Sequence, residues 1–254
     1  MNTKRKLMFS FIGLILSIAV FSTVVFAWFA KSDVSADFIV ETGNLETTTK
    51  LYHAVGTNSG AEYTWNEVVT TDDAKRVFTN IVPGQVVTFF LVLHNQSTST
   101  VTVNYNINFG GFKHLADTKS ITDSEYTSYS SSTIITSANI PALFSAIAVK
   151  VQQFNVASAD TRPTNQQVKD VSIYKTDTYG KDDSAKTLSE YVTSTAIAEN
   201  GTLAKGAYTG YIIRFYFDPT VGTATPGKSN DFMNEAFLVN TIIASYTQKE
   251  EVIE

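Results

Sequence analysis

Three histidines, His53, His94 and His114, are the only imidazole side chains with which this chain could bind a metal. A zinc protease of the common type has two histidines one helical turn apart in a His-Glu-x-x-His motif, so that both imidazoles reach one ion. None of the three histidines lies in such a motif. We therefore expect surface or hydrogen-bonded histidines, and we predict no catalytic residue, no metal site and no cofactor.

Acidic pairs at Asp72-Asp73 and Asp182-Asp183 are the other candidate metal ligands. They lack the spacing with which a calcium-binding loop wraps around an ion, so solvated turn charges are the favoured interpretation. The chain has no Gly-x-Ser-x-Gly elbow for a nucleophilic serine and no glycine-rich phosphate loop. Cysteine is absent, which excludes disulfides, thiol catalysis and cysteine-ligated zinc.

The charge balance argues against a nucleic-acid partner. The formal net charge is −5, and without Lys4, Arg5 and Lys6 the remainder has 16 basic against 24 acidic residues. Phosphate binding needs a basic surface, which this composition does not provide.

The first 27 residues have the pattern of an export signal. Lys4-Arg5-Lys6 is followed by an uncharged apolar run from Leu7 to Ala30. Near its end, Val25-Phe26-Ala27 places small or medium residues at the −3 and −1 positions before Trp28. We predict cleavage between Ala27 and Trp28. The run is also long enough to span a membrane, so an uncleaved anchor with the domain outside is the alternative. Either way, the protein is expected to be secreted or displayed at the cell surface.

Short apolar runs bounded by turn residues predict an all-β fold for residues 28–254, a single antiparallel β sandwich. Residues 101–109 alternate strictly between apolar and polar side chains, so one face should pack on a core. Residues 86–93 are apolar almost throughout, which predicts a central strand covered on both faces. Pro83-Gly84 predicts a tight turn. Strands are expected at 36–42, 46–55, 75–81, 86–94, 99–109, 143–154, 208–217 and 235–247.

Two segments, 117–142 and 155–207, interrupt this rhythm and are interpreted as insertions of loops and helix. One helix is expected within the second insertion, with Ser184 as its N-cap and Gly201 as its stop. Leu188, Tyr191, Val192 and Thr195 would lie on one face of that helix.

Several landmarks occur in a specific order. They are Val40-Glu41-Thr42-Gly43-Asn44-Leu45, then Ile81-Val82-Pro83-Gly84, then an apolar strand ending at Asn95, then Asn108-Phe109-Gly110-Gly111-Phe112. In this order they resemble the TasA/camelysin family of exported bacterial biofilm-matrix and fibre proteins. The resemblance covers about residues 1–112 and, more loosely, 143–154 and 232–248. Val40 stands where the family more often has Phe, and Ile81 where it has Leu.

The resemblance implies a jelly-roll-like sandwich, processing by a dedicated signal peptidase of the SipW type, and assembly into extracellular fibres. In such fibres the N-terminal strand of one subunit completes the sheet of the next. The implied partners are other copies of the chain and the signal peptidase, and an accessory matrix protein is a further candidate.

The N-terminal residues are compatible with this mechanism in their own right. In an extended strand at residues 36–45, Phe38 and Val40 share one side and Ile39 the other, so Phe38 and Val40 could enter the core of an acceptor. The resemblance implies that Gly43 and Leu45 complete the donor-strand motif. The alternative is that this strand pairs within its own domain.

Two other functions stay open. The camelysin branch of the family carries a metallopeptidase label, so a secreted metalloprotease is one alternative, although the chain shows no motif for a zinc ligand set. A monomeric surface-binding jelly-roll module is the other, with Trp65, Tyr63 and Tyr126 as a conceivable sugar platform.

Overall fold

The computed structural model describes residues 46–55, 63–69, 82–97, 101–115, 133–193, 195–221, 232 and 235–249. The predicted leader 1–27, the cleavage site at Ala27 and Trp28, and the expected strand 75–81 lie outside these residues. The same is true of most of the segment 117–142 and of the predicted donor strand with Phe38, Ile39, Val40, Gly43 and Leu45.

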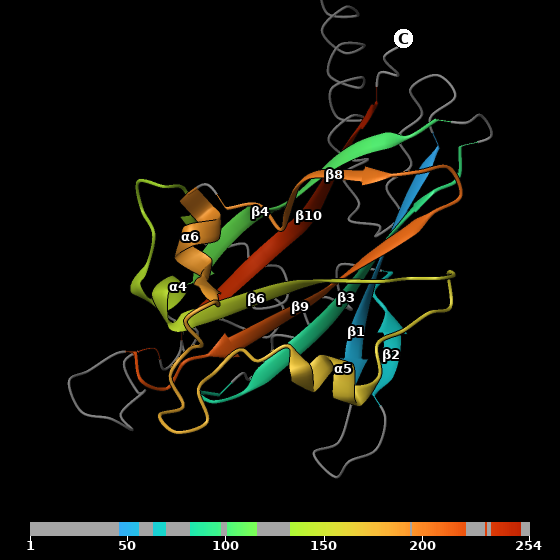
Figure 1. Cartoon of the computed structure of the whole chain (residues 1–254). Coiled ribbons are helices and arrows are strands. Elements are labelled where there is room, and N and C mark those ends of the chain that lie inside the picture. Colours follow the sequence, from blue (N-terminus) through green and yellow to red (C-terminus); the bar gives the residue numbers. More distant parts are fainter. Residues whose placement is uncertain are drawn as a thin grey trace, which may run out of the picture. The chain divides into compact units, whose positions relative to one another are not determined.

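Two antiparallel sheets pack face to face and form a β sandwich, as the sequence predicts (Figure 1). Within the described residues the larger sheet has six strands in the order β2-β1-β3-β9-β6-β7. These strands are β1 (Thr47–Val55), β2 (Thr64–Glu67), β3 (Val86–Asn95), β6 (Ile147–Phe154), β7 (Lys186–Thr187) and β9 (Tyr208–Phe217).

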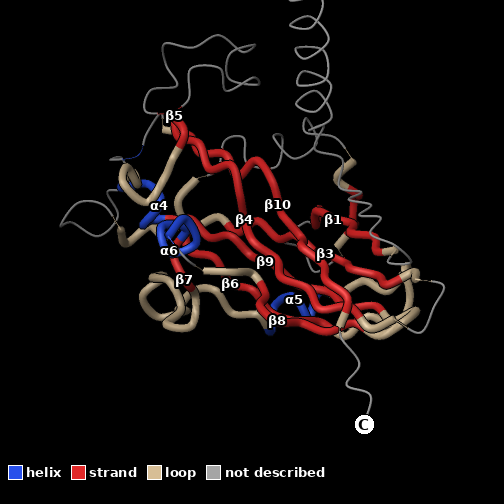
Figure 2. Tube along the Cα trace, turned by 90° about the horizontal axis from the view of Figure 1, so that it is seen from above, coloured by secondary structure: helices blue, strands red, loops and turns tan. Residues whose placement is uncertain are grey.

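The smaller sheet, four-stranded in the described part of the chain, is centred on β4 (Val103–Leu115). The strand β10 (Ala236–Gln248) pairs with one side of β4, and β5 (Thr133–Ile134) and β8 (Ala198–Leu203) pair with its other side. The chain crosses from one sheet to the other after β3, β5, β7, β8 and β9, so each sheet is built from several separate parts of the chain (Figure 2). Such crossings are typical of jelly-roll-like sandwiches.

The strand β3 lies between β1 and β9 and is buried on both faces, which confirms the prediction from its apolar run. Phe89 and Leu91 point between the sheets into the main core, whereas Phe90 and Val92 point to the outer side of the six-stranded sheet. A strand without a polar face needs cover on both sides. The second cover comes from the segment after β6.

The segment 155–187 covers the outer face of the six-stranded sheet. Val156 and Val171 pack with Phe90 and Ile212, and Ile173 packs with Tyr216 in a neighbouring cluster. It contains the helix α5 (Asn165–Asp170), whose N-terminus is closed by a capping box between Thr164 and Gln167. The predicted insertion 155–207 is therefore shorter than expected, because β8 at its end is part of the sandwich.

A buried arginine ties this cover to the sheet. Arg214 on β9 is 8% exposed, and its Nη1 donates to the carbonyl oxygens of Val168 and Val171 at the C-terminal end of α5. Burial lowers the pKa of Arg214. Its positive charge lies at the end of the helix where exposed carbonyl groups favour a cation.

Several expected boundaries need correction. The expected strand 143–154 is a helical turn, α4 (Ala142–Ala146), followed by β6, and the expected strand 99–109 is β4, which starts and ends later. The predicted helix is α6 (Leu188–Thr193), which follows β7 directly, and Glu190 accepts hydrogen bonds from the N–H (2.6 Å) and the hydroxyl (3.0 Å) of Thr187. Ser184 is therefore not the N-cap. Gly201 is not a helix stop either, because it lies within β8.

None of the helices in the described part of the chain has the length and apolar character needed to span a membrane.

Candidate functional site

The longest open sheet edge in the described residues belongs to β10. This strand pairs with β4 from Ala236 opposite Leu115 to Gln248 opposite Val103, and no described strand pairs with its other side. An open edge presents backbone N–H and C=O groups that can bind another extended chain. The 13 residues of β10 correspond to about 43 Å of edge, whereas a donor strand of ten residues needs roughly 33 Å.

A second open edge, on β6, is shorter. The strand β7 pairs with β6 only at Ala148 and Val149, which leaves Lys150–Phe154 with β9 as the only described partner strand. Five residues cannot hold the ten residues of the predicted donor strand. The edge of β10 is therefore the better candidate acceptor.

Apolar side chains lie between the sheets along the edge of β10. Val239 and Ile242 of β10 and Leu51 of β1 pack against the main core but remain partly exposed. Among the described strands, only β3 pairs with the first half of β1, because β2 pairs with β1 only from Tyr52 onward. Among the described residues, unpaired strand edges and partly exposed apolar side chains thus occur together on this side of the sandwich. Strand addition requires both.

Buried hydroxyl groups form two hydrogen-bonded pairs between the sheets near the C-terminal end of β10. Thr49 of β1 and Tyr246 of β10 are joined by a short hydrogen bond between their hydroxyls, and Tyr105 of β4 bonds Tyr211 of β9 across 2.7 Å. Burial raises the pKa of Tyr246 to about 12, partly offset by the Thr49 hydroxyl, and burial also raises the pKa of Tyr211. The pairs link the two sheets with polar contacts inside an otherwise apolar core.

The first described residue is Glu46, three positions before Thr49 of these hydroxyl pairs. The N–H of Glu46 donates to the hydroxyl of Ser97 at 3.0 Å, and its carbonyl accepts from the N–H of Gln96 at 2.8 Å. The residue that follows the predicted donor strand is therefore held against the end of β3. Thr49 and Tyr246 show that β10 finishes at the same end of the sandwich.

Asn95, one of the landmark residues, has a structural role at this end. It is fully buried; its side-chain N–H groups donate to the carbonyls of Val101 (2.8 Å) and Leu203 (3.0 Å), and its Oδ1 accepts from the N–H of Ser97 (3.1 Å). One amide thus joins the end of β3 to the start of β4 and to β8. Although Asn95-Gln96-Ser97 matches a glycosylation pattern, a buried and fully bonded Asn95 cannot accept a glycan.

At Gly111 and Phe112, the next landmark, the alternation of inward and outward side chains along β4 shifts by one residue. Gly111 has a φ of +65°, a conformation that side chains disfavour. Before it, Ile107 and Phe109 point to the core at alternate positions; after it, Phe112 points there instead of residue 111. Phe112 then packs edge-on against Phe109, with 6.5 Å between ring centroids.

Pro83 and Gly84 form the predicted turn. The N–H of Gln85 donates to the carbonyl of Val82 at 3.0 Å, and Gly84 has a φ of +86°. The N–H of Gly84 also donates to the carbonyl of Phe217 at 2.7 Å. This turn therefore begins β3 and ties it to the end of β9.

The three histidines have separate surroundings. His53 packs on Phe89 with 5.6 Å between ring centroids, His94 stacks on Tyr208 at 3.8 Å, and His114 Nε2 lies 2.9 Å from a carboxylate oxygen of Glu235. Burial lowers the pKa values of His53 and His94. No group of three metal-binding side chains occurs among the residues that the structure describes.

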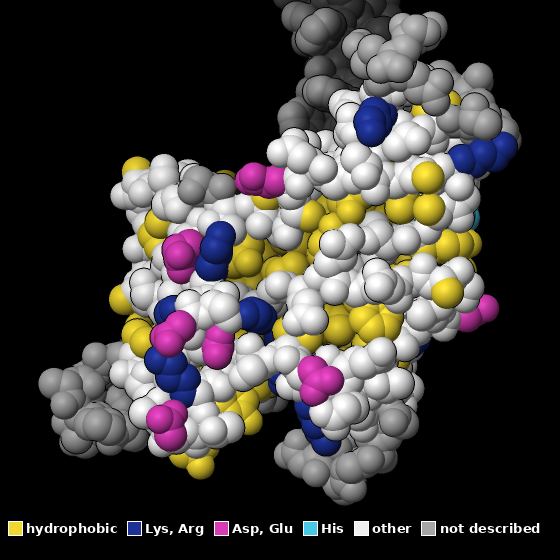
Figure 3. All heavy atoms as spheres, viewed as in Figure 1, with side chains coloured by type: hydrophobic (Ala, Val, Ile, Leu, Met, Phe, Trp, Pro, Cys, Tyr) yellow, Lys and Arg dark blue, Asp and Glu magenta, His cyan; other side chains and the backbone are white. Residues whose placement is uncertain are grey.

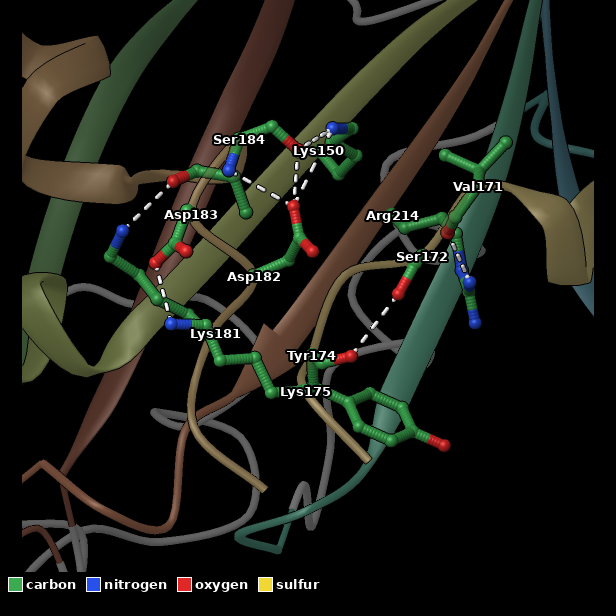
Figure 4. A network of polar contacts seen from close by, with 11 residues as sticks. Lys150, Val171, Ser172, Tyr174, Lys175, Lys181, Asp182, Asp183, Ser184 and Arg214 are labelled. Atoms are coloured by element: carbon green, nitrogen blue, oxygen red, sulfur yellow. Dashed lines mark hydrogen bonds and ion pairs between the residues drawn. The ribbon is translucent and has the colours of Figure 1, made fainter. Parts of the chain in front are cut away.

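The acidic pair at Asp182 and Asp183 already has cationic partners. Figure 3 shows charged side chains of both signs interspersed around α6 and the loop before it. In close view, Lys175 Nζ lies 2.6 Å from Asp183 Oδ1 and Lys150 Nζ lies 3.9 Å from Asp182 Oδ1 (Figure 4). The hydroxyl and backbone N–H of Ser184 donate to Asp182 and lower the pKa of its carboxyl. Such hydrogen bonds between an aspartate and a residue two positions later are typical of a turn, not of a cation site. Asp72 and Asp73 lie outside the described residues.

Two of the three aromatic residues considered as a sugar platform, Tyr63 and Trp65, contact the segment 155–187. Trp65 packs on Phe90 with 5.7 Å between ring centroids, and its indole N–H donates to the carbonyl of Pro163 at 3.2 Å. Tyr63 lies beside Trp65 at 6.2 Å, under the same covering segment. Tyr126 lies outside the described residues.

Comparison of the chain with protein-family models and with curated proteins finds no match.

Proposed function

We propose that this protein is an exported structural subunit that assembles into extracellular fibres by donor-strand complementation. Residues 36–45 of one copy would pair with the open edge of β10 in the next copy. The observation that carries the proposal is that no strand of the described residues pairs with the outer edge of the 13-residue β10, beside which Val239 and Ile242 are partly exposed. An edge of this length, next to accessible core, is what an added strand needs.

The direction of the strands favours a partner copy as the acceptor. Residues 36–45 lead to Glu46, which lies at the end of the sandwich where β10 finishes. If they ran straight along β10 of their own domain, they would be parallel to β10, whereas every described ladder is antiparallel. A second copy can present its segment in the antiparallel sense.

Side-chain burial alone would give modest affinity. Placing Phe38 and Val40 between the sheets removes roughly 200 Å² of apolar surface from water, or ~5 kcal/mol before ordering costs, at about 25 cal/mol/Å². The backbone hydrogen bonds along β10 would add to this term, and repetition along a fibre would add avidity. Stable fibres therefore require both the apolar side chains and the ladder.

The resemblance to the TasA/camelysin family supports the same proposal. Three landmarks have defined structural roles: the Pro83-Gly84 turn, the Asn95 side chain and the phase change at Gly111. On this proposal the leader is removed after Ala27 by a dedicated signal peptidase, and the protein acts in the extracellular matrix or at the cell surface. N-terminal sequencing of exported protein tests the cleavage, and a chain that still begins at Met1 or Asn2 would contradict it.

Electron microscopy of exported protein tests the assembly. The Phe38→Asp variant should accumulate as folded monomer, because it would place an unpaired carboxylate in the acceptor. Deletion of residues 28–40 should have the same effect. The matched control is Ile39→Asp, which changes the neighbouring residue on the opposite side of the strand and should still form fibres. Fibres from Phe38→Asp as abundant as those of the parent would refute the proposal.

A further inference from the structure

The inward-facing positions of β10 shift by one residue partway along the strand. Tyr246, Ala244 and Ile242 lie in or against the main core at alternate positions. The next residue toward the start of β10 that packs against this core is Val239, three positions before Ile242. Residues 240 and 241 therefore form what we call a two-residue step between two inward positions. Because the side chains of a regular strand alternate, such a step moves the inward positions from even to odd residue numbers.

The strand β4 makes a two-residue step at the same level, directly beside β10 (Figure 1). Phe109 and Phe112 are its inward residues here, and they stand opposite the two residues that flank the step of β10. Between them lie Gly110 and Gly111, the second with a φ of +65°. A third strand beside β10 would need its own step at this level, since otherwise its apolar side chains would face the core along only part of β10.

The predicted donor strand contains the residues for a matching step. Phe38 and Val40 share one side of an extended strand, but Leu45 comes five positions after Val40, an odd number that strict alternation places on the other side. Gly43 and Asn44 stand directly before Leu45. Glycine adopts a positive φ freely, and asparagine does so more readily than most residues. A two-residue step at Gly43 and Asn44 would bring Leu45 to the side of Phe38 and Val40.

We propose that this step fixes a single antiparallel register of the donor strand on β10 of the next copy. The inference rests on the proposed function and names the acceptor residue for each inward donor residue. The step at Gly43 and Asn44 would stand opposite residues 241 and 240. The inward pairs would then be Phe38 with Tyr246, Val40 with Ala244, Thr42 with Ile242, and Leu45 with Val239.

Burial of the acceptor side chains supports this register. Val239 and Ile242 are the partly exposed apolar residues of β10 that pack against the main core. The register places Leu45 beside Val239 and Thr42 beside Ile242, so both acceptor side chains gain a neighbour. Removal of such apolar surface from water is favourable.

A register shifted by two residues is the closest competitor. It would place the donor's step at Glu41 and Thr42 and would set Gly43 beside Val239. A positive φ is strongly disfavoured for a β-branched residue such as Thr42, and a glycine would leave Val239 without a side chain to cover it. A further shift in the same direction would place the charge of Glu41 between the sheets, and a shift in the opposite direction would leave Leu45 outside.

Disulfide cross-linking in assembled fibres tests the register, because the natural chain has no cysteine. The register sets Glu41 opposite Ile243 and Ile39 opposite Ser245, on the outward side where Ile243 and Ser245 are exposed. Residues directly opposite each other in an antiparallel pair have Cα atoms about 4.5–5.5 Å apart, which suits a disulfide. The double variants Glu41→Cys/Ile243→Cys and Ile39→Cys/Ser245→Cys should therefore form fibres under reducing conditions and, after oxidation, a ladder of covalent oligomers on a non-reducing gel.

The matched controls recombine the same four substitutions. Glu41→Cys/Ser245→Cys and Ile39→Cys/Ile243→Cys each place the two cysteines two residues out of register. Such diagonal neighbours lie about 7–8 Å apart, beyond the usual reach of a disulfide, so these variants should assemble but give no ladder. The two expected pairs share no substitution, so each tests the register independently of the other.

The outcomes separate this inference from the proposed function. Absence of fibres from the parent would contradict the proposed function, and the register with it. Fibres of all four double variants without any ladder would place the donor strand away from β10 and contradict both. A ladder from Ile39→Cys/Ile243→Cys alone would establish the competing register, and equal ladders from all four variants would show several registers; either result would overturn the single register alone.

Discussion

Replacement of Asn95 by alanine should destabilise the domain more than any surface substitution. The change removes three hydrogen bonds at a fully buried position and leaves two carbonyl groups and one N–H without their partner. At about 1 kcal/mol per bond, the expected loss in the free energy of unfolding is ~3 kcal/mol. For a domain of this size, 1 kcal/mol corresponds to about 2–4 °C, so Tm should fall by roughly 6–12 °C.

Urea unfolding of monomeric protein, followed by tryptophan fluorescence and far-UV circular dichroism, measures this loss. The matched control is Gln96→Ala, which removes the exposed side chain of the next residue and should change the free energy of unfolding by less than about 0.5 kcal/mol. Asn95→Asp keeps the shape but would place a carboxylate against two carbonyl oxygens, so it should be less stable than Asn95→Ala at neutral pH. An Asn95→Ala protein as stable as the control would refute the role given to this amide.

Three further predictions concern the backbone of β4, the response to alkali and catalysis. Gly111→Ala should cost about 1–2 kcal/mol in chemical unfolding because of its positive φ, whereas Gly180→Ala, at ordinary φ with its nearest contact at 3.4 Å, should be close to neutral. Burial raises the pKa of Tyr191 to about 12, so its contribution to stability is complete below pH ~10 and is lost as pH rises from about 10 to about 12; Tyr191→Phe should show a shallower decline in pH-dependent unfolding, and an unchanged slope would contradict this. Purified mature protein should show no casein cleavage that a chelator removes and zinc restores, and such cleavage, if lost on replacing a histidine with alanine, would promote the metalloprotease alternative.

The strands that could be predicted from sequence are those with a local signal. The apolar run of β3 and the runs of β9 and β10 appear close to their expected bounds. The segment at 142–154 could not be divided correctly, because a short apolar helix and a buried strand have the same composition. Pro141, at the N-cap of α4, is the signal that could have marked the start of a helical turn.

Other features depend on contacts between distant residues, which no local pattern encodes. The strand β8 has the polar sequence Ala198–Leu203 and is a strand because its backbone pairs with β4. Gly201 there packs on the ring of Tyr105, where a Cβ would overlap the ring, so its apparent role as a helix stop was wrong. The alternating apolar and polar residues at 101–109 also did not predict that the inward-facing positions of β4 would shift by one residue at Gly111.

The donor segment and the acceptor edge of the proposed assembly site also differ in whether a local sequence pattern predicts them. The donor segment could be proposed from its own residues, since Phe38 and Val40 alternate with Ile39 within a short stretch. The acceptor edge could not, because an open edge on β10 follows from the order of the strands in the sheet. Strand order is set by long-range packing and not by the composition of any one strand.

Mixing two variants that each lack one half of the contact tests the proposed assembly most directly. One variant lacks residues 28–40, and the other carries Val239→Glu, which would place a charge beside the acceptor edge; Ile134→Glu, at an exposed isoleucine of β5, is the matched control. Size-exclusion chromatography with mass measurement should find both variants monomeric alone and paired one to one when mixed, while the control assembles as the parent does. Monomers that stay apart on mixing, or fibres from Val239→Glu alone, would contradict donor-strand assembly through β10.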